Sequence, residues 1–266
     1  MAKLEIRFSG KVPEHYDRCL GPFIFEHYAQ EMADRCAALN PGKVLETAAG
    51  TGIVTKHLRE RIAPEASLVS TDLSQPMLDH AASKLGSAPA TEFAAADACN
   101  LPFADKQFDA VVCQYGIMFF PDKPAGYAEA LRVLKPGGTY LFSVWGDWSE
   151  NPFAQIAHNV AAEFCPDNPP EFYKVPFGYN DIDAIRSALE LAGFADCKHE
   201  VLRHSQPLFD IDLFTQGLVY GNPLHIELLE RGVEPEEART RLKQALHQQL
   251  GDSMPLKAHF FSASRT

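Results

Sequence analysis

Short apolar runs alternate with longer amphipathic stretches along the first half of the chain. Runs of strand length occupy residues 43–46, 67–71, 92–96, 108–113 and 139–145. Between them, apolar positions with helical spacing lie near residues 52–62, 76–85 and 124–134. The connection over residues 98–107 is short or irregular. This alternation is typical of βαβ units, which place parallel strands side by side in one sheet.

Two segments of the second half depart from this pattern. Residues 146–179 are rich in proline and aromatic side chains, and residues 210–250 have the spacing of helices. Both are predicted to be insertions that contribute to a small helical cap. Before the first insertion, Lys135-Pro136-Gly137-Gly138 predicts a helix stop followed by a tight turn.

The pattern of the sheet resumes between and after the insertions. Asn180 and Asp183 predict the start of a helix that ends at Gly193. Further strands are expected near residues 197–204 and at 256–262. With the five earlier strands, the sequence predicts an α/β fold with a doubly wound, mostly parallel seven-stranded sheet.

These elements divide the chain into three predicted parts. Residues 1–40 are expected to form an N-terminal helical lid. The sheet domain is expected to take residues 41–146, 180–209 and 251–266, and the cap residues 147–179 and 210–250.

Composition places the chain among ordinary globular proteins. Hydrophobic residues make up 46% and charged residues 22% of its 266 residues, which excludes a disordered chain. The 35 acidic and 24 basic residues give a formal net charge of −11, so no nucleic acid partner is expected. The six cysteines include no CxxC pair or zinc-like spacing. Reduced packing thiols and no metal site are therefore expected.

The chain shows no sequence pattern for export or for spanning a membrane. Glu5 and Arg7 interrupt the apolar stretch that a secretory signal needs. The best apolar run, residues 110–120, is too short to span a bilayer and contains Gln114. A cytoplasmic location is expected.

The first strand leads into a loop that carries an acid and two glycines. In Val44-Leu45-Glu46-Thr47-Ala48-Ala49-Gly50-Thr51-Gly52, Glu46 ends the strand and both glycines precede the next helix. An open α/β sheet binds its ligand at this position. Glycines also serve simply to turn a strand tightly into a helix, so the glycines alone leave a structural role open.

Acids also follow the next two strands. Asp72 lies 72 − 52 = 20 residues after Gly52, where a carboxylate can accept hydrogen bonds from both ribose hydroxyls of an adenine nucleoside. Asp97 ends the third strand, where it can accept from the exocyclic amine of a base. A core does not require acids at three successive strand ends, which favours nucleoside binding over solvated loop residues.

The same loop weakens the case for a dinucleotide. Thr55 stands where a dinucleotide-binding loop has its third glycine, so a pyrophosphate is less favoured. Glu46, directly before the loop, instead suits a ligand with an ammonium group.

Several ordered motifs together carry a family resemblance. They are the glycine loop after residue 44, Thr71-Asp72-Leu73-Ser74-Gln75-Pro76-Met77-Leu78, Ala96-Asp97-Ala98 with Leu101-Pro102-Phe103, Phe108-Asp109, and Leu134-Lys135-Pro136-Gly137-Gly138. Over about residues 40–145 the chain resembles the class I S-adenosylmethionine-dependent methyltransferases, in the branch of the ubiquinone and menaquinone C-methyltransferases. Ala48 stands where many members have glycine. The resemblance implies S-adenosyl-L-methionine as cofactor and S-adenosyl-L-homocysteine as product.

The resemblance also implies roles for individual residues around that cofactor. The methionine part would be held by the first loop, with Glu46, Ala48, Gly50, Thr51 and Gly52. Asp72 would bind the ribose hydroxyls, Leu73 and Met77 would pack on the adenine, Asp97 and Ala98 would recognise its edge, and Gln114 and Tyr115 would lie near the methyl group. An ordinary core role for Leu73 and Met77 stays open.

Residues outside the sheet are candidates for the lid and for the acceptor site. In similar methyltransferases a tyrosine of an N-terminal Tyr-Asp pair faces the active site, so Tyr16 and Phe25 are expected to close over the cofactor; the alternative is a hydrophobic seam against the cap. The cap aromatics favour a flat or apolar acceptor, or they fill the cap's own core. These aromatics are Trp145, Trp148, Phe153, Phe172, Tyr173, Phe177 and Tyr179.

The sequence thus predicts methyl transfer to an oxygen, nitrogen or carbon atom of a small molecule by in-line displacement in a dry pocket. Candidate general bases are His15, Tyr16, His158 and His225, and none is assigned as catalytic because a lone histidine is more often structural. An NAD(P)-dependent oxidoreductase or epimerase, and a non-catalytic protein that binds S-adenosylmethionine, are the alternatives. A homodimer is left open.

Overall fold

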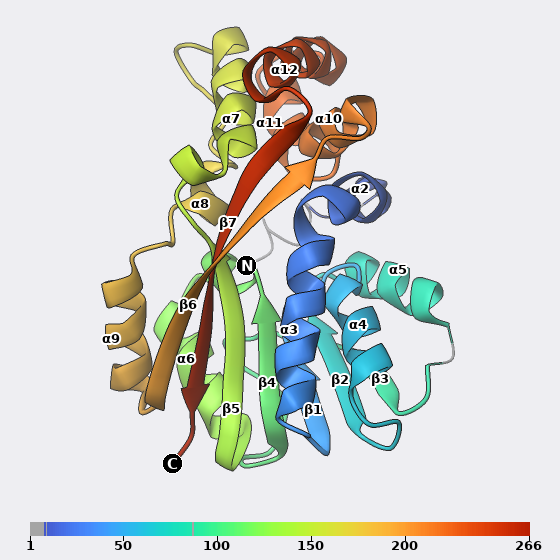
Figure 1. Cartoon of the computed structure of the whole chain (residues 1–266). Coiled ribbons are helices and arrows are strands. Elements are labelled where there is room, and N and C mark those ends of the chain that lie inside the picture. Colours follow the sequence, from blue (N-terminus) through green and yellow to red (C-terminus); the bar gives the residue numbers. More distant parts are fainter. Residues whose placement is uncertain (1–7, 9, 87) are drawn as a thin grey trace.

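The computed structural model describes residues 8, 10–86 and 88–266. Its centre is one seven-stranded sheet with the strand order β3-β2-β1-β4-β5-β7-β6 (Figure 1). The strands are β1 (Lys43–Glu46), β2 (Ser67–Asp72), β3 (Thr91–Ala95), β4 (Phe108–Gln114), β5 (Leu134–Trp145), β6 (Ala195–Pro207) and β7 (Ser253–Ser264). β7 runs antiparallel to both neighbours, and the other pairs are parallel. The predicted sheet is confirmed.

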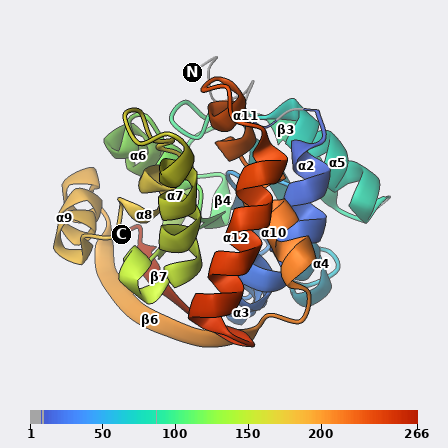
Figure 2. The same cartoon turned by 90° about the horizontal axis from the view of Figure 1, so that it is seen from above.

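Helices cover both faces of this sheet. α3 (Glu26–Ala38), α4 (Ile53–Arg61) and α5 (Gln75–Leu85) lie on one face, and α6 (Lys123–Val133) and α9 (Ile182–Ala192) on the other (Figures 1 and 2). Strands enclosed on both faces need apolar side chains at successive positions. Val44 and Leu45 in β1 and Val111 and Val112 in β4 are accordingly fully buried. The helices on both faces thus hold the carboxyl ends of the strands in place, where a ligand would bind.

A helical cap stands beyond the carboxyl ends of the parallel strands (Figure 1). It contains α7 (Pro152–Phe164), α8 (Lys174–Phe177), α10 (Ile211–Tyr220), α11 (Leu224–Leu229) and α12 (Pro235–Leu250). The long strands β6 and β7 extend past the parallel strands toward it. Short helical turns η3 (Ile117–Phe119) and η4 (Trp148–Glu150) complete the connections.

The N-terminal region is divided between the two layers. α2 (Val12–His15) and the π-helix η2 (Tyr16–Phe25) contact α10 of the cap, whereas α3 packs on α4 and on the sheet. A Cβ atom at Gly217 in α10 would lie 2.7 Å from the Cys19 carbonyl oxygen, so this glycine lets the cap approach η2 closely. Of the lid predicted over residues 1–40, α3 thus packs with the sheet layers, and residues 1–7 and 9 lie outside the described residues; the division into lid, sheet domain and cap stays a prediction.

Two local predictions differ from the structure. The predicted turn at Lys135–Gly138 lies inside β5, which begins at Leu134 because Leu134 already pairs with Phe108 before a bulge. Helix α9 is capped by Asp181, whose carboxylate accepts from the backbone N–H groups of Asp183 and Ala184, and not by Asn180. Both differences concern side chains or pairing partners that the local pattern does not specify.

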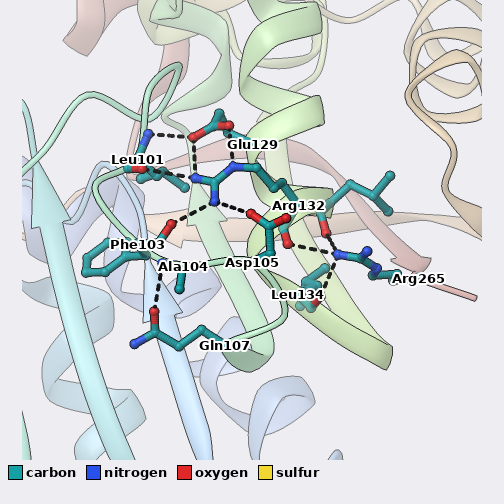
Figure 3. A network of polar contacts seen from close by, with 10 residues as sticks. Leu101, Phe103, Ala104, Asp105, Gln107, Glu129, Arg132, Leu134 and Arg265 are labelled. Atoms are coloured by element: carbon teal, nitrogen blue, oxygen red, sulfur yellow. Dashed lines mark hydrogen bonds and ion pairs between the residues drawn. The ribbon is translucent and has the colours of Figure 1, made fainter.

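The irregular connection after β3 is held by Arg132 on α6 (Figure 3). Its guanidinium donates to the carbonyl oxygens of Leu101 and Phe103 and pairs with Asp105 and Glu129, at 2.7–3.0 Å. Glu129 in turn accepts from the Leu101 backbone N–H at 2.6 Å, and Arg132 lowers the pKa of its carboxyl group. Side chains of α6 thus fix this irregular segment of the chain in place.

Candidate functional site

A cavity of about 340 Å³ lies between the ends of the parallel strands, η2 and the cap. Several of the residues predicted to bind a cofactor line it. These are Tyr16, Phe25, Ala48, Gly50, Asp72, Leu73, Met77, Asp97, Ala98, Gln114 and Tyr115. Open α/β sheets bind ligands in the crevice beyond the carboxyl ends of their strands. The cavity therefore occupies the place where this fold offers a site.

Asp72 is fixed at the polar end of the cavity. Its Oδ2 accepts from the Gly50 backbone N–H at 2.8 Å, and its Oδ1 accepts from the Ser74 backbone N–H at 2.8 Å. Burial raises the pKa of this carboxyl group, and the two backbone N–H groups oppose that shift. Each oxygen retains acceptor capacity, because a carboxylate has about four lone-pair positions. The geometry suits a pair of neighbouring hydroxyls on a ligand.

A smaller cavity of about 30 Å³ lies beside the glycine loop, with Glu46 and Thr51 in its lining. Glu46 Oε2 accepts from Thr55 Oγ1 at 2.6 Å and from Ser70 Oγ at 2.8 Å. Burial raises the pKa of Glu46 to about 7. Gln114 lines both cavities, and its buried Oε1 has no hydrogen-bond partner among the described residues. A buried acceptor without a donor, beside the carboxyl group of Glu46, fits an ammonium group.

Gly52 lines neither cavity. A Cβ atom there would lie 2.8 Å from the Ala81 Cβ, and the residue has a φ of +75°. Its glycine is therefore required by the approach of α5 and by the left-handed backbone. Thr55, the residue at the third position of the glycine pattern, is fully buried and bonded to Glu46. These positions serve the packing of the loop, which is the structural role that the sequence left open for its glycines.

The loops after β1 and β4 meet under strain. Ala48 and Tyr115 both have a φ of about +54°, a region that residues other than glycine seldom adopt. A Cβ atom at Gly116 would lie 2.4 Å from the Ala48 Cβ. Tyr115 stacks on Trp145 with ring centroids 4.0 Å apart, and its buried hydroxyl has no hydrogen-bond partner in the described part of the chain. The surrounding packing thus holds Tyr115 in a strained conformation, and its ring lines both cavities.

The cap end of the cavity is aromatic. Of the cap candidates, Trp145, Phe153, Phe172, Tyr173 and Phe177 line it, whereas Trp148 and Tyr179 do not. The Tyr179 hydroxyl lies 3.0 Å from the hydroxyl of Tyr127, which gives this ring a structural role.

Sequence reasoning missed a further group of lining residues. These are Phe8, Leu20, Ile24, Ser74, Ala96, Gly116, Met118, Phe119, Phe120, Pro121, Pro176, Leu218 and Asn222. The Asn222 side chain donates to the Leu218 carbonyl oxygen at 2.9 Å and to the Tyr173 hydroxyl at 3.2 Å. Asn222 follows a glycine and precedes a proline, so its sequence signals only a turn. The π-helical geometry that turns Leu20 and Ile24 inward has no sequence signal of its own.

The four candidate general bases differ in whether they line the cavity. Tyr16 lines the cavity, and burial raises the pKa of its hydroxyl. His15, His158 and His225 are not among the lining residues. His225 Nδ1 lies 2.8 Å from the Asn222 carbonyl oxygen, and burial lowers the pKa values of His15 and His158. The geometry assigns no general base to a histidine of this group.

In the described part of the chain, no helix is long and apolar enough to cross a membrane. No cluster of three or more His, Cys, Asp or Glu side chains in the same residues could hold a metal ion.

Comparison with known proteins identifies the central part of the chain. Residues 45–142 match the family model of the methyltransferase domain. A demethylmenaquinone methyltransferase of Deinococcus radiodurans is 38% identical over 123 residues, which are 46% of this chain and 51% of that protein. The chain spans about half the length of the curated relatives it matches.

Solved structures share the fold. A putative methyltransferase from Bacillus halodurans has a TM-score of 0.58 at 21% identity, covering 89% of this chain and 99% of that one. The phosphoethanolamine N-methyltransferase 2 of Haemonchus contortus, in complex with S-adenosyl-L-methionine, has a TM-score of 0.61 at 17% identity, covering 95% of this chain and 56% of that one. The fold is that of the class I S-adenosylmethionine-dependent methyltransferases. Residues 45–142 form a methyltransferase domain similar to the ubiquinone and menaquinone branch, and the family resemblance of the sequence is confirmed.

Proposed function

We propose that this chain is an S-adenosylmethionine-dependent methyltransferase that acts on a flat, uncharged small molecule. One observation carries the proposal. The cavity that begins at the backbone-held carboxylate of Asp72 continues without interruption into a chamber walled by Phe153, Phe172 and Phe177. A hydroxyl-binding end and an apolar end in one cavity suit a nucleoside cofactor beside an apolar acceptor.

The residues of the polar end fit the cofactor group by group. Asp72 would accept hydrogen bonds from both ribose hydroxyls, and Leu73 and Met77 would enclose the adenine, with Asp97 and Ala98 at its edge. Glu46 and Gln114 Oε1 would receive the ammonium group beside Gly50 and Thr51 of the loop, with Gly52 shaping that loop from behind. When bound, the cofactor supplies an electrophilic methyl group.

The residues of the cap end indicate the charge of the acceptor and how the protein would promote transfer to it. Among the described residues that line the cavity, Asp72 and Asp97 are the charged ones, and both lie at the polar end. An aromatic chamber without a charged group favours an uncharged acceptor, because burying an unpaired charge is costly. The protein would then promote transfer by holding the acceptor in line with the methyl group and by excluding water. Tyr115 and Trp145 stand at the boundary where the two ligands would meet.

Calorimetric titration tests the cofactor first. The protein is titrated with S-adenosyl-L-homocysteine and, in parallel, with NAD. Micromolar binding of S-adenosyl-L-homocysteine alone is the expected result. Binding of NAD alone would replace the proposal with an oxidoreductase, and binding of neither would contradict it.

Acceptor turnover tests the second half of the proposal. Neutral aromatic and quinol-like compounds are incubated with the protein and S-adenosyl-L-methionine carrying a labelled methyl group. Transfer of label to one of these compounds is expected. Cofactor binding without transfer to any class of acceptor would favour a non-catalytic binding protein.

A further inference from the structure

The N-terminal wall of the cavity is an unusual helix. Residues Tyr16–Phe25 form a ten-residue π-helix, although such helices occur mostly as single turns and often at functional sites. Pro22 inside it lacks the N–H that an α-helical hydrogen bond would need. Tyr16, Leu20, Ile24 and Phe25 from this segment all line the cavity.

The wider helix brings two aromatic rings together. Tyr16 and Phe25 are 25 − 16 = 9 residues apart, and their rings are stacked with centroids 4.7 Å apart. Nine residues make 9/3.6 = 2.5 turns of an α-helix, which would place the two side chains on opposite faces. The π-helical geometry is therefore what builds the Tyr16–Phe25 wall.

Asp17 lies at a junction of three elements. Its Oδ1 accepts from the hydroxyl of the buried Thr51 at 2.9 Å and lies 2.5 Å from Lys84 Nζ. Its Oδ2 lies 3.5 Å from His80 Nε2. Thr51 belongs to the glycine loop, and His80 and Lys84 belong to α5, the helix that also carries Met77. One carboxylate thus joins η2 to both elements that border the polar end of the cavity.

We infer that Asp17 is a positioning residue for the cofactor. Through Thr51 it ties η2 to the glycine loop, so that the Tyr16–Phe25 wall covers the ligand at the polar end. Lys84 pairs with the same Oδ1 that accepts from Thr51, and His80 lies near Oδ2, so both partners help to orient the carboxylate. This inference rests on the proposed function, since the wall is expected to enclose S-adenosylmethionine.

The bond to Thr51 distinguishes Asp17 from an ordinary surface ion pair. Exposed pairs contribute little, because solvent screens them and two long side chains must be ordered. The Thr51 hydroxyl is buried and comes from the residue directly after Gly50, whose N–H holds Asp72. Loss of Asp17 therefore removes the bond that joins η2 to the glycine loop, next to the place where the ribose would bind.

Calorimetric titration with S-adenosyl-L-homocysteine compares Asp17→Ala with a matched control, Asp34→Ala. Asp34 also lies on the N-terminal helices and pairs with Arg61 on α4, away from the cavity. Asp17→Ala is expected to raise Kd about tenfold, the loss of one charge-assisted hydrogen bond. Asp34→Ala is expected to stay within about twofold. Equal affinities of Asp17→Ala and the wild type would overturn the inference, whereas a wild type that does not bind contradicts the proposed function itself.

A measurement on the free protein separates positioning from general destabilisation. Hydrogen exchange in Asp17→Ala should speed up in residues 16–25 while α3 keeps the protection of the wild type. Thr51→Val should reproduce this change, and Thr51→Ser, which keeps the hydroxyl, should restore it. Uniformly faster exchange across the whole chain, or no change in η2, would overturn the inference.

Discussion

The two ends of the cavity are built on different principles. At the polar end, backbone N–H groups of the glycine loop and of the turn after β2 fix Asp72, so the site is held by bonds that are local to the parallel sheet. At the cap end, rings from α7, α8 and the connection before α8 form the walls, which depend on aromatic packing. Under the proposed function, cofactor recognition would belong to the sheet and acceptor recognition to the insertions.

Of the substitutions considered for the two ends of the cavity, removal of Asp72 should have the largest effect on cofactor affinity. Asp72→Ala deletes the acceptor of two ribose hydroxyls and leaves two backbone N–H groups without their partner. Affinity for S-adenosyl-L-homocysteine should fall roughly 30-fold or more, equivalent to about 2–3 kcal/mol for charge-assisted bonds. Calorimetry measures the loss.

Asp79→Ala is the matched control for that variant. Asp79 is an exposed acid on α5 whose partner is the side chain of Gln75. The affinity of Asp79→Ala for S-adenosyl-L-homocysteine should equal that of the wild type. A threefold or smaller loss in Asp72→Ala would contradict the placement of the ribose.

The second prediction concerns pH at the same end. Burial raises the pKa of Glu46 to about 7, so the free protein carries a largely protonated Glu46 at pH 6. Because the ammonium group of the ligand favours the carboxylate, affinity for S-adenosyl-L-homocysteine should rise about tenfold from pH 6 to pH 8. Glu46→Gln should remove this dependence, which titrations across that range would show.

The same shift sets the sign of a stability change. Because the pKa of Glu46 is raised on folding, its contribution to stability is present below the pKa of an unfolded glutamate and is lost as pH rises through about 7. Thermal unfolding of Glu46→Gln should therefore lose less Tm between pH 5 and pH 8 than the wild type. A parallel decline in both proteins would refute the assignment.

The smallest expected effect on the cofactor comes from the cap end. Phe172 is half-buried, lines the cavity and lies near Phe119 and Tyr173, with ring centroids 6.4 Å and 5.2 Å away. Phe172→Ala should leave Kd for S-adenosyl-L-homocysteine within about twofold but raise KM for a flat acceptor about tenfold, as loss of an aromatic contact predicts. Steady-state kinetics separate the two constants.

His158→Ala serves as the control in the cap. Its ring contacts Trp148 outside the cavity lining, so neither constant should change. If Phe172→Ala weakened the cofactor as much as the acceptor, the two ends would not be independent.

Some features of this protein follow from the sequence alone. Acids at the ends of three strands, and glycines in the first loop, identify the polar end because parallel strands bring their carboxyl ends to one edge. The strands from β1 to β4 also have nearly the predicted bounds, while β5 begins earlier through a pairing with Phe108 that no local pattern encodes.

The rest was decided by tertiary structure. Which rings of the insertions face the cavity depends on how α7 packs on β7, α8 on β5 and η3, and α10 on η2, and Tyr179 turns instead to Tyr127. Gly52 belongs to a glycine pattern that is typical of ligand-binding loops, but a glycine is needed there because α5 approaches it closely. The Asp17 bond to Thr51 joins residues 34 positions apart through a π-helix. Such contacts form only when separate elements pack, so the hydrophobic periodicity of a single segment does not predict them.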